Sequence, residues 1–108
     1  MPFTYIVRCA DDTLYVGHTE DLASREQTHN DGKGAAYTAK RRPVRIVYAE
    51  QHESTESAIE REHQLKRWSR EKKEALIRGD RVALDWLSHG SSRATIAFTW
   101  HDLLNHRS

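Results

Sequence analysis

The chain has 108 residues, of which 37% are hydrophobic and 31% are charged, and its formal net charge is +1. This length supports one modest hydrophobic core and excludes two independent domains, while the composition excludes a disordered or collagen-like chain. The single cysteine, Cys9, excludes an internal disulfide and a zinc site made of paired cysteines. We expect one folded domain in which Cys9 is a buried, inert thiol.

The sequence contains no membrane-spanning or targeting pattern. A span needs about twenty consecutive apolar residues, and no segment approaches that length. The first residues also lack the basic and then apolar arrangement of a signal peptide. We therefore expect a cytoplasmic protein without a membrane partner.

The first predicted element is an antiparallel hairpin. Residues 3–9 (FTYIVRC) and 13–18 (TLYVGH) carry the β-branched and aromatic residues that are typical of strands. Asp11 and Asp12 lie between the two runs, where a turn is required.

The two tyrosines of this hairpin constrain its register. Side chains alternate along a strand, so Tyr5 and Tyr15 share a face only if paired positions sum to an even number, as when Tyr5 lies opposite Gly17. We predict that Tyr5 and Tyr15 share one face, so an odd-length connection or a bulge must lie within residues 10–13. A strict two-residue turn would instead pair Tyr5 with His18 and place the tyrosines on opposite faces.

A helix is predicted after the hairpin. Thr19 or Asp21 can cap it, and an Asn-Asp-Gly sequence ends it. Leu22, Arg25 and His29 are spaced to share one face, which presents polar groups to a cleft or a buried network. Taken singly, however, an arginine at such an edge often extends to solvent and a histidine often serves only as a hydrogen-bonding group.

The remaining pattern predicts a third strand and two more helices. Residues 32–43 form a basic loop rich in glycine and small residues, and residues 44–49 form the strand. Helices are expected over residues 55–68 and, after a cap at Ser69, to about Arg78, with a glycine just beyond. The predicted fold is α+β within the broad α/β class: a three-stranded mixed or antiparallel sheet flanked by helices, in the order β-β-α-β-α-α.

The last part of the chain has a weaker pattern. We expect residues 1–80 to form the main domain and residues 81–108 to form an extension that packs on it or trails from it. Residues 82–87 can continue a helix, and residues 94–100 (ATIAFTW) can form a short strand.

Charge is segregated along the sequence. Residues 32–49 contain five basic residues and no acidic residue, and residues 66–73 contain five more against one glutamate. Between them, residues 50–62 contain five glutamates against one arginine. This distribution is compatible with a phosphate-binding surface beside an acidic cation site, and ordinary solvated faces are an equal alternative. The candidate nucleic-acid-binding residues are Lys33, Lys40, Arg41, Arg42, Arg45, Lys66 and Arg67.

Glu62 lies inside the apolar stripe of its predicted helix. At roughly 100° per residue, Ile59 and Leu65 flank it at about 60° on either side, whereas Glu60 points to the opposite polar face. A carboxylate on the core-facing side needs a partner. That partner can be a metal ion, Arg25 or Lys66, and an i to i+4 pair with Lys66 would be purely structural.

Several catalytic patterns are absent from the sequence. It contains no histidine pair with zinc-protease spacing, no glycine-rich phosphate loop before a helix and no nucleophile-elbow serine. Each tyrosine, judged alone, is more often an ordinary sheet residue. Together with the basic segments, the remaining set suits phosphodiester hydrolysis: Tyr5, Tyr15, Arg25, His29 and Glu62.

The order of these residues resembles the GIY-YIG nuclease superfamily, most closely its small single-domain bacterial proteins. TYIVRC resembles the first motif, and LYVGHTEDLASREQTHN resembles the second motif with the helix that follows. GKGAAYTAKRRPVRIVY and ESAIEREHQLKRWSREKKEAL resemble the later segments, so that the likeness covers residues 4–78. The first motif lacks its namesake glycine and isoleucine.

The resemblance implies a DNA endonuclease that uses one weakly bound Mg²⁺ or Mn²⁺ ion, in DNA repair or processing. Glu62 matches the metal-binding glutamate, and Arg25 matches an arginine that would bind phosphate oxygens. Tyr5 matches the first-motif tyrosine, which would orient or deprotonate water with help from a neighbouring cation or another proton acceptor. Tyr15 and His29 would position water and phosphate or transfer a proton.

Two other functions remain open from the sequence. One is a nucleic-acid-binding module with the same fold and no turnover, acting on single- or double-stranded DNA. The other is an adaptor that binds a repair partner through its C-terminal tail. Trp86 and Trp100 are candidate anchors for such a partner, with core packing as their alternative role.

Overall fold

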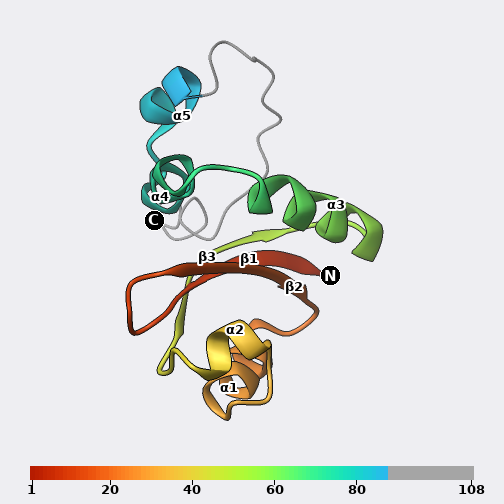
Figure 1. The fold of residues 1–108 in the computed structure, drawn as a ribbon. Helices are drawn as coiled ribbons and strands as arrows, with labels where there is room; N and C mark the ends of the chain where they lie inside the picture. The colour runs from red at the N-terminus through yellow and green to blue at the C-terminus, as the bar shows by residue number, and fades with distance from the viewer. Residues whose placement is uncertain (88–108) are drawn as a thin grey trace, which may run out of the picture.

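Three strands and five helices follow one another along residues 1–87, the part of the chain that the computed structural model describes, apart from the side chain of Trp86. The elements are β1 (Phe3–Arg8), β2 (Leu14–Thr19), α1 (Leu22–Asn30), α2 (Ala36–Ala39), β3 (Arg45–Gln51), α3 (Thr55–Lys66), α4 (Arg70–Arg78) and α5 (Arg81–Leu87). Figure 1 shows the sheet as a central layer, with α1 and α2 on one side and α3 and α4 on the other.

The sheet has the strand order β2-β1-β3, and both neighbours of β1 are antiparallel to it. This confirms the predicted three-stranded sheet flanked by helices and fixes it as wholly antiparallel. β1 is the central strand, so β2 lies at one edge and β3 at the other. The edge strand β2 contacts α3, which brings the Glu62 helix beside the hairpin.

The register of the hairpin is the one that places the two tyrosines on one face. Tyr5 pairs with Gly17, and Val7 pairs with Tyr15. The amide of Cys9 donates to the carbonyl of Thr13 at 2.9 Å, so three residues connect the strands. The last of these three adopts a φ of 71°, the left-handed conformation that commonly closes three-residue hairpins. The prediction of an odd-length connection is confirmed.

Short polar side chains begin α1 and α4 as predicted. Asp21 accepts a hydrogen bond from the Ser24 amide at the start of α1, and Ser69 accepts one from the Lys72 amide at the start of α4. Gly79 ends α4 with a φ of 70°, which suits a residue without a side chain. These caps satisfy backbone groups that would otherwise lack partners at the helix ends.

The predicted element order was wrong within residues 32–43, which contain the short helix α2. Its N-cap residue, Ala35, has no hydrogen-bonding side chain, so the usual start signal is missing. Backbone hydrogen bonds from Ala39 to Ala35 and from Arg41 to Thr38 hold the turn. The extension beyond residue 80 adds α5, where a helical continuation was predicted.

The core divides into one apolar cluster on each face of the sheet. Ile6, Val16 and Leu65 belong to the cluster on the α3 and α4 face. Tyr5 and Cys9 belong to the cluster on the other face, and Cys9 is buried as predicted. Tyr5 is only 2% exposed, so its ring is packed as a core residue.

A buried ionic network fastens α3 to the sheet. Glu50 on β3 is 1% exposed and accepts hydrogen bonds from the Tyr48 hydroxyl and from Nε of Arg61 on α3, the latter at 2.7 Å. Removing one partner of such a buried pair leaves an uncompensated charge and is strongly unfavourable. Since Glu62 follows Arg61 directly, this network also helps to fix the orientation of Glu62.

No helix within residues 1–87 is long and apolar enough to cross a membrane. The predicted strand over residues 94–100 and the suggested anchor Trp100 lie outside the described residues. The predicted boundary at residue 80 and the suggested partner contact through the tail therefore stay predictions.

Candidate active site

Tyr5, Tyr15 and His29 form an aromatic cluster between the hairpin and α1. The phenol oxygen of Tyr5 lies 2.8 Å from Nε2 of His29. The two tyrosine rings meet the imidazole edge-on, with centroid distances of 5.9 Å for Tyr5 and 5.6 Å for Tyr15. Three of the five predicted catalytic side chains therefore lie in direct contact.

The surrounding hydrogen bonds assign the tautomer of His29. Thr38 on α2 donates its hydroxyl proton to the Ala35 carbonyl at 3.0 Å, and its oxygen lies 2.8 Å from Nδ1 of His29. Because a hydroxyl has one proton to donate, Thr38 must accept from Nδ1. Nε2 then carries a lone pair and accepts the proton of the Tyr5 hydroxyl. Tyr5 retains lone pairs that can accept a hydrogen bond from water.

Two glycines make room for this chain of hydrogen bonds. A Cβ atom on Gly17, the cross-strand partner of Tyr5, would lie 2.5 Å from the phenol oxygen. A Cβ atom on Gly34 would lie 2.3 Å from Nδ1 of His29. Both distances are far below van der Waals contact, so a larger side chain at either position would displace a site residue.

Burial and charge shift the pKa values of this cluster in opposite directions. Burial raises the pKa of Tyr5 well above its usual value, and the nearby Arg25 charge partly offsets that rise. Burial and the same Arg25 charge lower the pKa of His29 below its usual value of 6.5. At neutral pH the tyrosine is therefore protonated and the histidine is neutral, which suits His29 as a proton acceptor.

Arg25 lies on the predicted face of α1, close enough to influence the pKa values of both Tyr5 and His29. Within residues 1–87 its guanidinium takes part in no ion pair or side-chain hydrogen bond. Arginine offers a planar set of donors that matches phosphate geometry. The structure thus leaves this guanidinium available to an anion.

Glu62 is buried on the sheet-facing side of α3, at 8% exposure, whereas Glu60 is exposed. The helical prediction that separated these two residues is confirmed. One carboxylate oxygen lies 2.5 Å from Nδ1 of His18, and the other lies 2.8 Å from Nζ of Lys66. Burial opposes ionisation, but the hydrogen bonds from Lys66 and His18 outweigh it and lower the pKa of Glu62.

Glu62 therefore has two structural partners. Lys66 is the partner expected from the sequence, and His18 is a second one. Glu62 still fits a divalent cation, because Mg²⁺ commonly binds through one carboxylate and keeps several water ligands. Lys66 is 45% exposed at its side chain, so its ammonium can leave the carboxylate for solvent. No cluster of three or more histidine, cysteine or acidic side chains suited to a metal occurs in residues 1–87.

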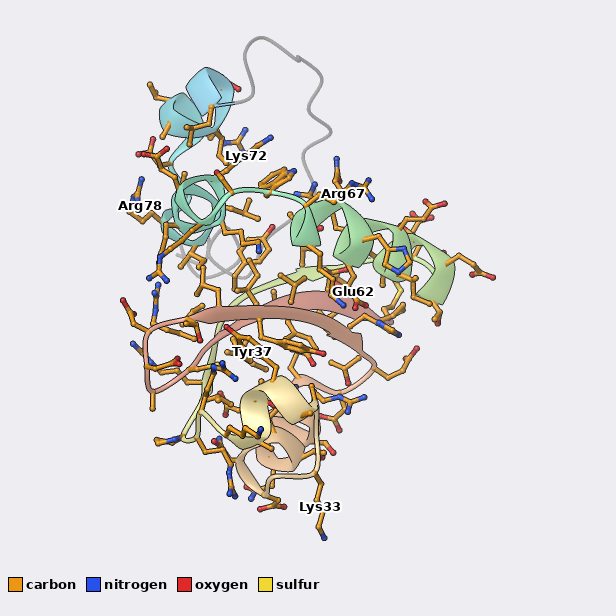
Figure 2. The ribbon with its side chains drawn as sticks, viewed as in Figure 1. Lys33, Tyr37, Glu62, Arg67, Lys72 and Arg78 are labelled. Carbon is orange, nitrogen blue, oxygen red and sulfur yellow. The ribbon has the colours of Figure 1, made fainter. Side chains whose placement is uncertain are left out.

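Glu62 and the aromatic cluster meet around the edge strand β2. His18, which binds Glu62, directly follows Gly17, over which the Tyr5 phenol lies. Nζ of Lys66 lies 5.8 Å from the centroid of the Tyr15 ring, and the Glu62 charge contributes to the raised pKa of Tyr5. Figure 2 shows Glu62 between α3 and the sheet, on the side away from α2.

The predicted nucleic-acid-binding residues are not gathered on one surface. Lys33 lies at the end of the molecule beside α1, whereas Arg67 lies beyond α3 on the opposite side of the sheet (Figure 2). Arg41 is held by Asp11 and by the Tyr37 carbonyl, and Arg42 donates to two backbone carbonyls. Four of the predicted residues are exposed and make no side-chain hydrogen bond or ion pair within residues 1–87: Lys33, Lys40, Arg45 and Arg67.

The sequence pattern did not single out Thr38, Gly34 or the contact between His18 and Glu62. Thr38 and His29 meet across a loop and α2, for which no local signal existed. Gly17 did carry a signal, because an isolated glycine in a strand indicates close approach by another group.

The chain is similar to one known domain family and to several bacterial proteins. Residues 1–75 match the GIY-YIG catalytic domain. Two Staphylococcus aureus proteins, the UPF0213 protein of strain Mu3 and the UPF0213 protein SA0446 of strain N315, are each 46% identical over 76 residues, which is 70% of this chain and 93% of each relative. The solution NMR structure of the UPF0213 protein BH0048 from Bacillus halodurans is 34% identical, with a TM-score of 0.48, and the match covers 88% of this chain and 100% of that one.

The domain match spans most of the chain, and the Staphylococcus relatives are matched over nearly their whole length. The matched region contains all five predicted catalytic residues: Tyr5, Tyr15, Arg25, His29 and Glu62. The chain therefore belongs to the GIY-YIG family and, within it, to the UPF0213 proteins.

Proposed function

We propose that this protein is a divalent-metal-dependent endonuclease that hydrolyses DNA phosphodiester bonds. The observation that carries the proposal is the hydrogen-bonded series from Tyr5 through His29 to Thr38. It supplies the proton acceptor that a tyrosine needs to activate water at neutral pH. Family membership supports the same chemistry, since the matched region is a catalytic domain.

In this mechanism Tyr5 and His29 act as one proton-transfer unit. A water molecule donates a hydrogen bond to the Tyr5 oxygen while the Tyr5 proton is donated to Nε2 of His29. As the water oxygen attacks phosphorus, the bond between phosphorus and the leaving oxygen breaks. The water proton passes to Tyr5, the Tyr5 proton passes to His29, and the leaving oxygen takes a proton from solvent. Thr38 keeps Nδ1 protonated, so the lone pair stays at Nε2, where it is needed.

Arg25 would bind the non-bridging oxygens of the phosphate. Its charge acts on both Tyr5 and His29, so we propose that it holds the phosphate near the activated water. As charge develops on the phosphate oxygens, a fixed guanidinium stabilises the transition state more than the ground state. Tyr15, edge-on to His29, would support the imidazole and border the phosphate.

Glu62 would hold the cation, which we propose to be Mg²⁺ or Mn²⁺. Such an ion would neutralise charge on the phosphate and on the leaving oxygen. Lys66 would give up its carboxylate oxygen to the ion, while His18 would keep hold of the other oxygen. One carboxylate ligand implies weak metal affinity and dependence on millimolar metal.

The test is incubation of the purified full chain with labelled single- and double-stranded DNA, either in Mn²⁺ or in EDTA. We expect cleavage with Mn²⁺ and none with EDTA. A Tyr5→Phe variant, purified in the same way, controls for a contaminating nuclease and should lose the activity. DNA binding without metal-dependent cleavage would favour the alternative function, a binding module in which the ion pair between Glu62 and Lys66 is permanent.

A further inference from the structure

Tyr37 extends the aromatic cluster to the protein surface. Its ring stacks on that of Tyr15, with centroids 6.0 Å apart and planes inclined by 24°. Cζ of Arg41 lies 3.8 Å from the centroid of the Tyr37 ring. Tyr15 also contacts His29. A continuous series of side-chain contacts therefore leads from His29 in the proposed catalytic site through Tyr15 to Tyr37 on α2.

Tyr37 does not behave as a core residue. It is 38% exposed, and within residues 1–87 its hydroxyl makes no hydrogen bond. Its neighbour Thr38 points inward to His29 and is fully buried. The short helix α2 therefore holds Thr38 against the proposed catalytic histidine and leaves the preceding residue, Tyr37, partly exposed.

Two hydrogen bonds hold the Arg41 guanidinium over the Tyr37 ring. Its Nε donates to Asp11 at 3.1 Å, and one terminal nitrogen donates to the Tyr37 carbonyl at 2.8 Å. These bonds fix the plane of the guanidinium and leave it partly exposed, at 32%. A fixed arginine plane over an aromatic ring is a surface on which a nucleobase can stack.

We propose that Tyr15, Tyr37 and Arg41 form a stacking platform for an unpaired base next to the scissile phosphate. The inference rests on the proposed function, and it names the substrate class as DNA with a single-stranded segment at the cleavage point. In continuous duplex DNA both faces of a base are covered by its neighbours, so only an unpaired base can stack on the protein. Residues 32–49, which contain no acidic residue, would attract the strand to this platform.

The test compares Tyr37→Leu with Tyr37→Phe, because both fill the space beside Tyr15 and only phenylalanine keeps a ring. Binding of labelled single-stranded and duplex oligonucleotides is measured by anisotropy in EDTA, so that cleavage plays no part. Stacking of one base contributes about 1 to 3 kcal/mol, so Tyr37→Leu should weaken single-strand binding about 5- to 150-fold. Duplex affinity, and the affinity of Tyr37→Phe for either DNA, should change less than about twofold.

A second measurement uses a single strand that contains 2-aminopurine, whose fluorescence is quenched by stacking. The wild type and Tyr37→Phe should quench it, and Tyr37→Leu should not. Equal affinity loss for single strands and duplex, or unchanged quenching in Tyr37→Leu, would overturn the platform. If the contrast holds but Mn²⁺-dependent cleavage is absent, the endonuclease proposal fails while the platform stands.

Discussion

The Tyr5 hydroxyl donates to Nε2 of His29 across 2.8 Å, joining a residue of the central strand to the helix that follows the hairpin. This contact gives Tyr5 a neutral proton acceptor in a buried setting, where the phenol alone would resist ionisation. It also explains why the hairpin register matters, because a shift of one residue would turn Tyr5 to the α3 face, away from His29.

Thr38 should position His29 through the tautomer. Replacing it by valine removes the acceptor for the buried Nδ1 proton, which should cost about 1 to 3 kcal/mol of stability. The DNA cleavage rate should also fall, by up to about 100-fold, the lower end of what general acid–base catalysis contributes. Thr38→Ser keeps the hydroxyl and is the matched control. Urea denaturation and single-turnover cleavage measure the two effects, and equal rates for the two variants would remove Thr38 from the mechanism.

The lowered pKa of His29 should appear in the pH dependence of folding. The folded protein favours the neutral ring, while the unfolded chain titrates near 6.5. The unfolded state therefore binds more protons below that pH, so the contribution of His29 is fully present above 6.5 and is lost as pH falls through its folded pKa. His29→Gln should show a shallower loss of stability between pH 7 and pH 5. Parallel pH curves for the two proteins would contradict the neutral, buried imidazole.

Local geometry explains which features the sequence could predict. Strand alternation fixed the shared face of Tyr5 and Tyr15, and the helical period separated Glu62 from Glu60. Both regularities act within one element or one hairpin, where the chain itself imposes the spacing. The caps at Asp21 and Ser69 are equally local.

The missing features depend on contacts between distant segments. α2 lacks a side-chain cap and an apolar stripe, and it is held by Thr38 packing onto His29. The approach of His18 to Glu62 spans 44 residues and depends on how α3 crosses the edge strand. Likewise, Arg41 looked like a phosphate ligand in the sequence, yet it lies on Tyr37 and is bound to Asp11. No local pattern encodes such pairings.

Lys33 and Lys40 should contribute to DNA affinity without contributing to chemistry. Both are exposed and flank α2, and neither forms an ion pair within residues 1–87. Replacing both by glutamine should weaken binding and reduce the slope of log K against log salt by about 0.9 for each duplex phosphate that a lysine no longer neutralises. The charge-preserving pair Lys33→Arg and Lys40→Arg should keep the wild-type slope. An unchanged slope in the glutamine variant would place the DNA on another surface.

The most direct measurement of the central claim is metal-dependent DNA cleavage by Glu62→Gln beside Glu60→Gln. The two substitutions change the net charge equally and lie two residues apart on α3, but only Glu62 is buried. Glu62→Gln should lower cleavage by orders of magnitude with DNA binding kept or improved, and Glu60→Gln should stay near wild type. Thermal unfolding of both variants separates this effect from the structural role of the bonds to Lys66 and His18. Full Mn²⁺-dependent cleavage by a folded Glu62→Gln protein, or an inactive Glu60→Gln protein, would contradict the account.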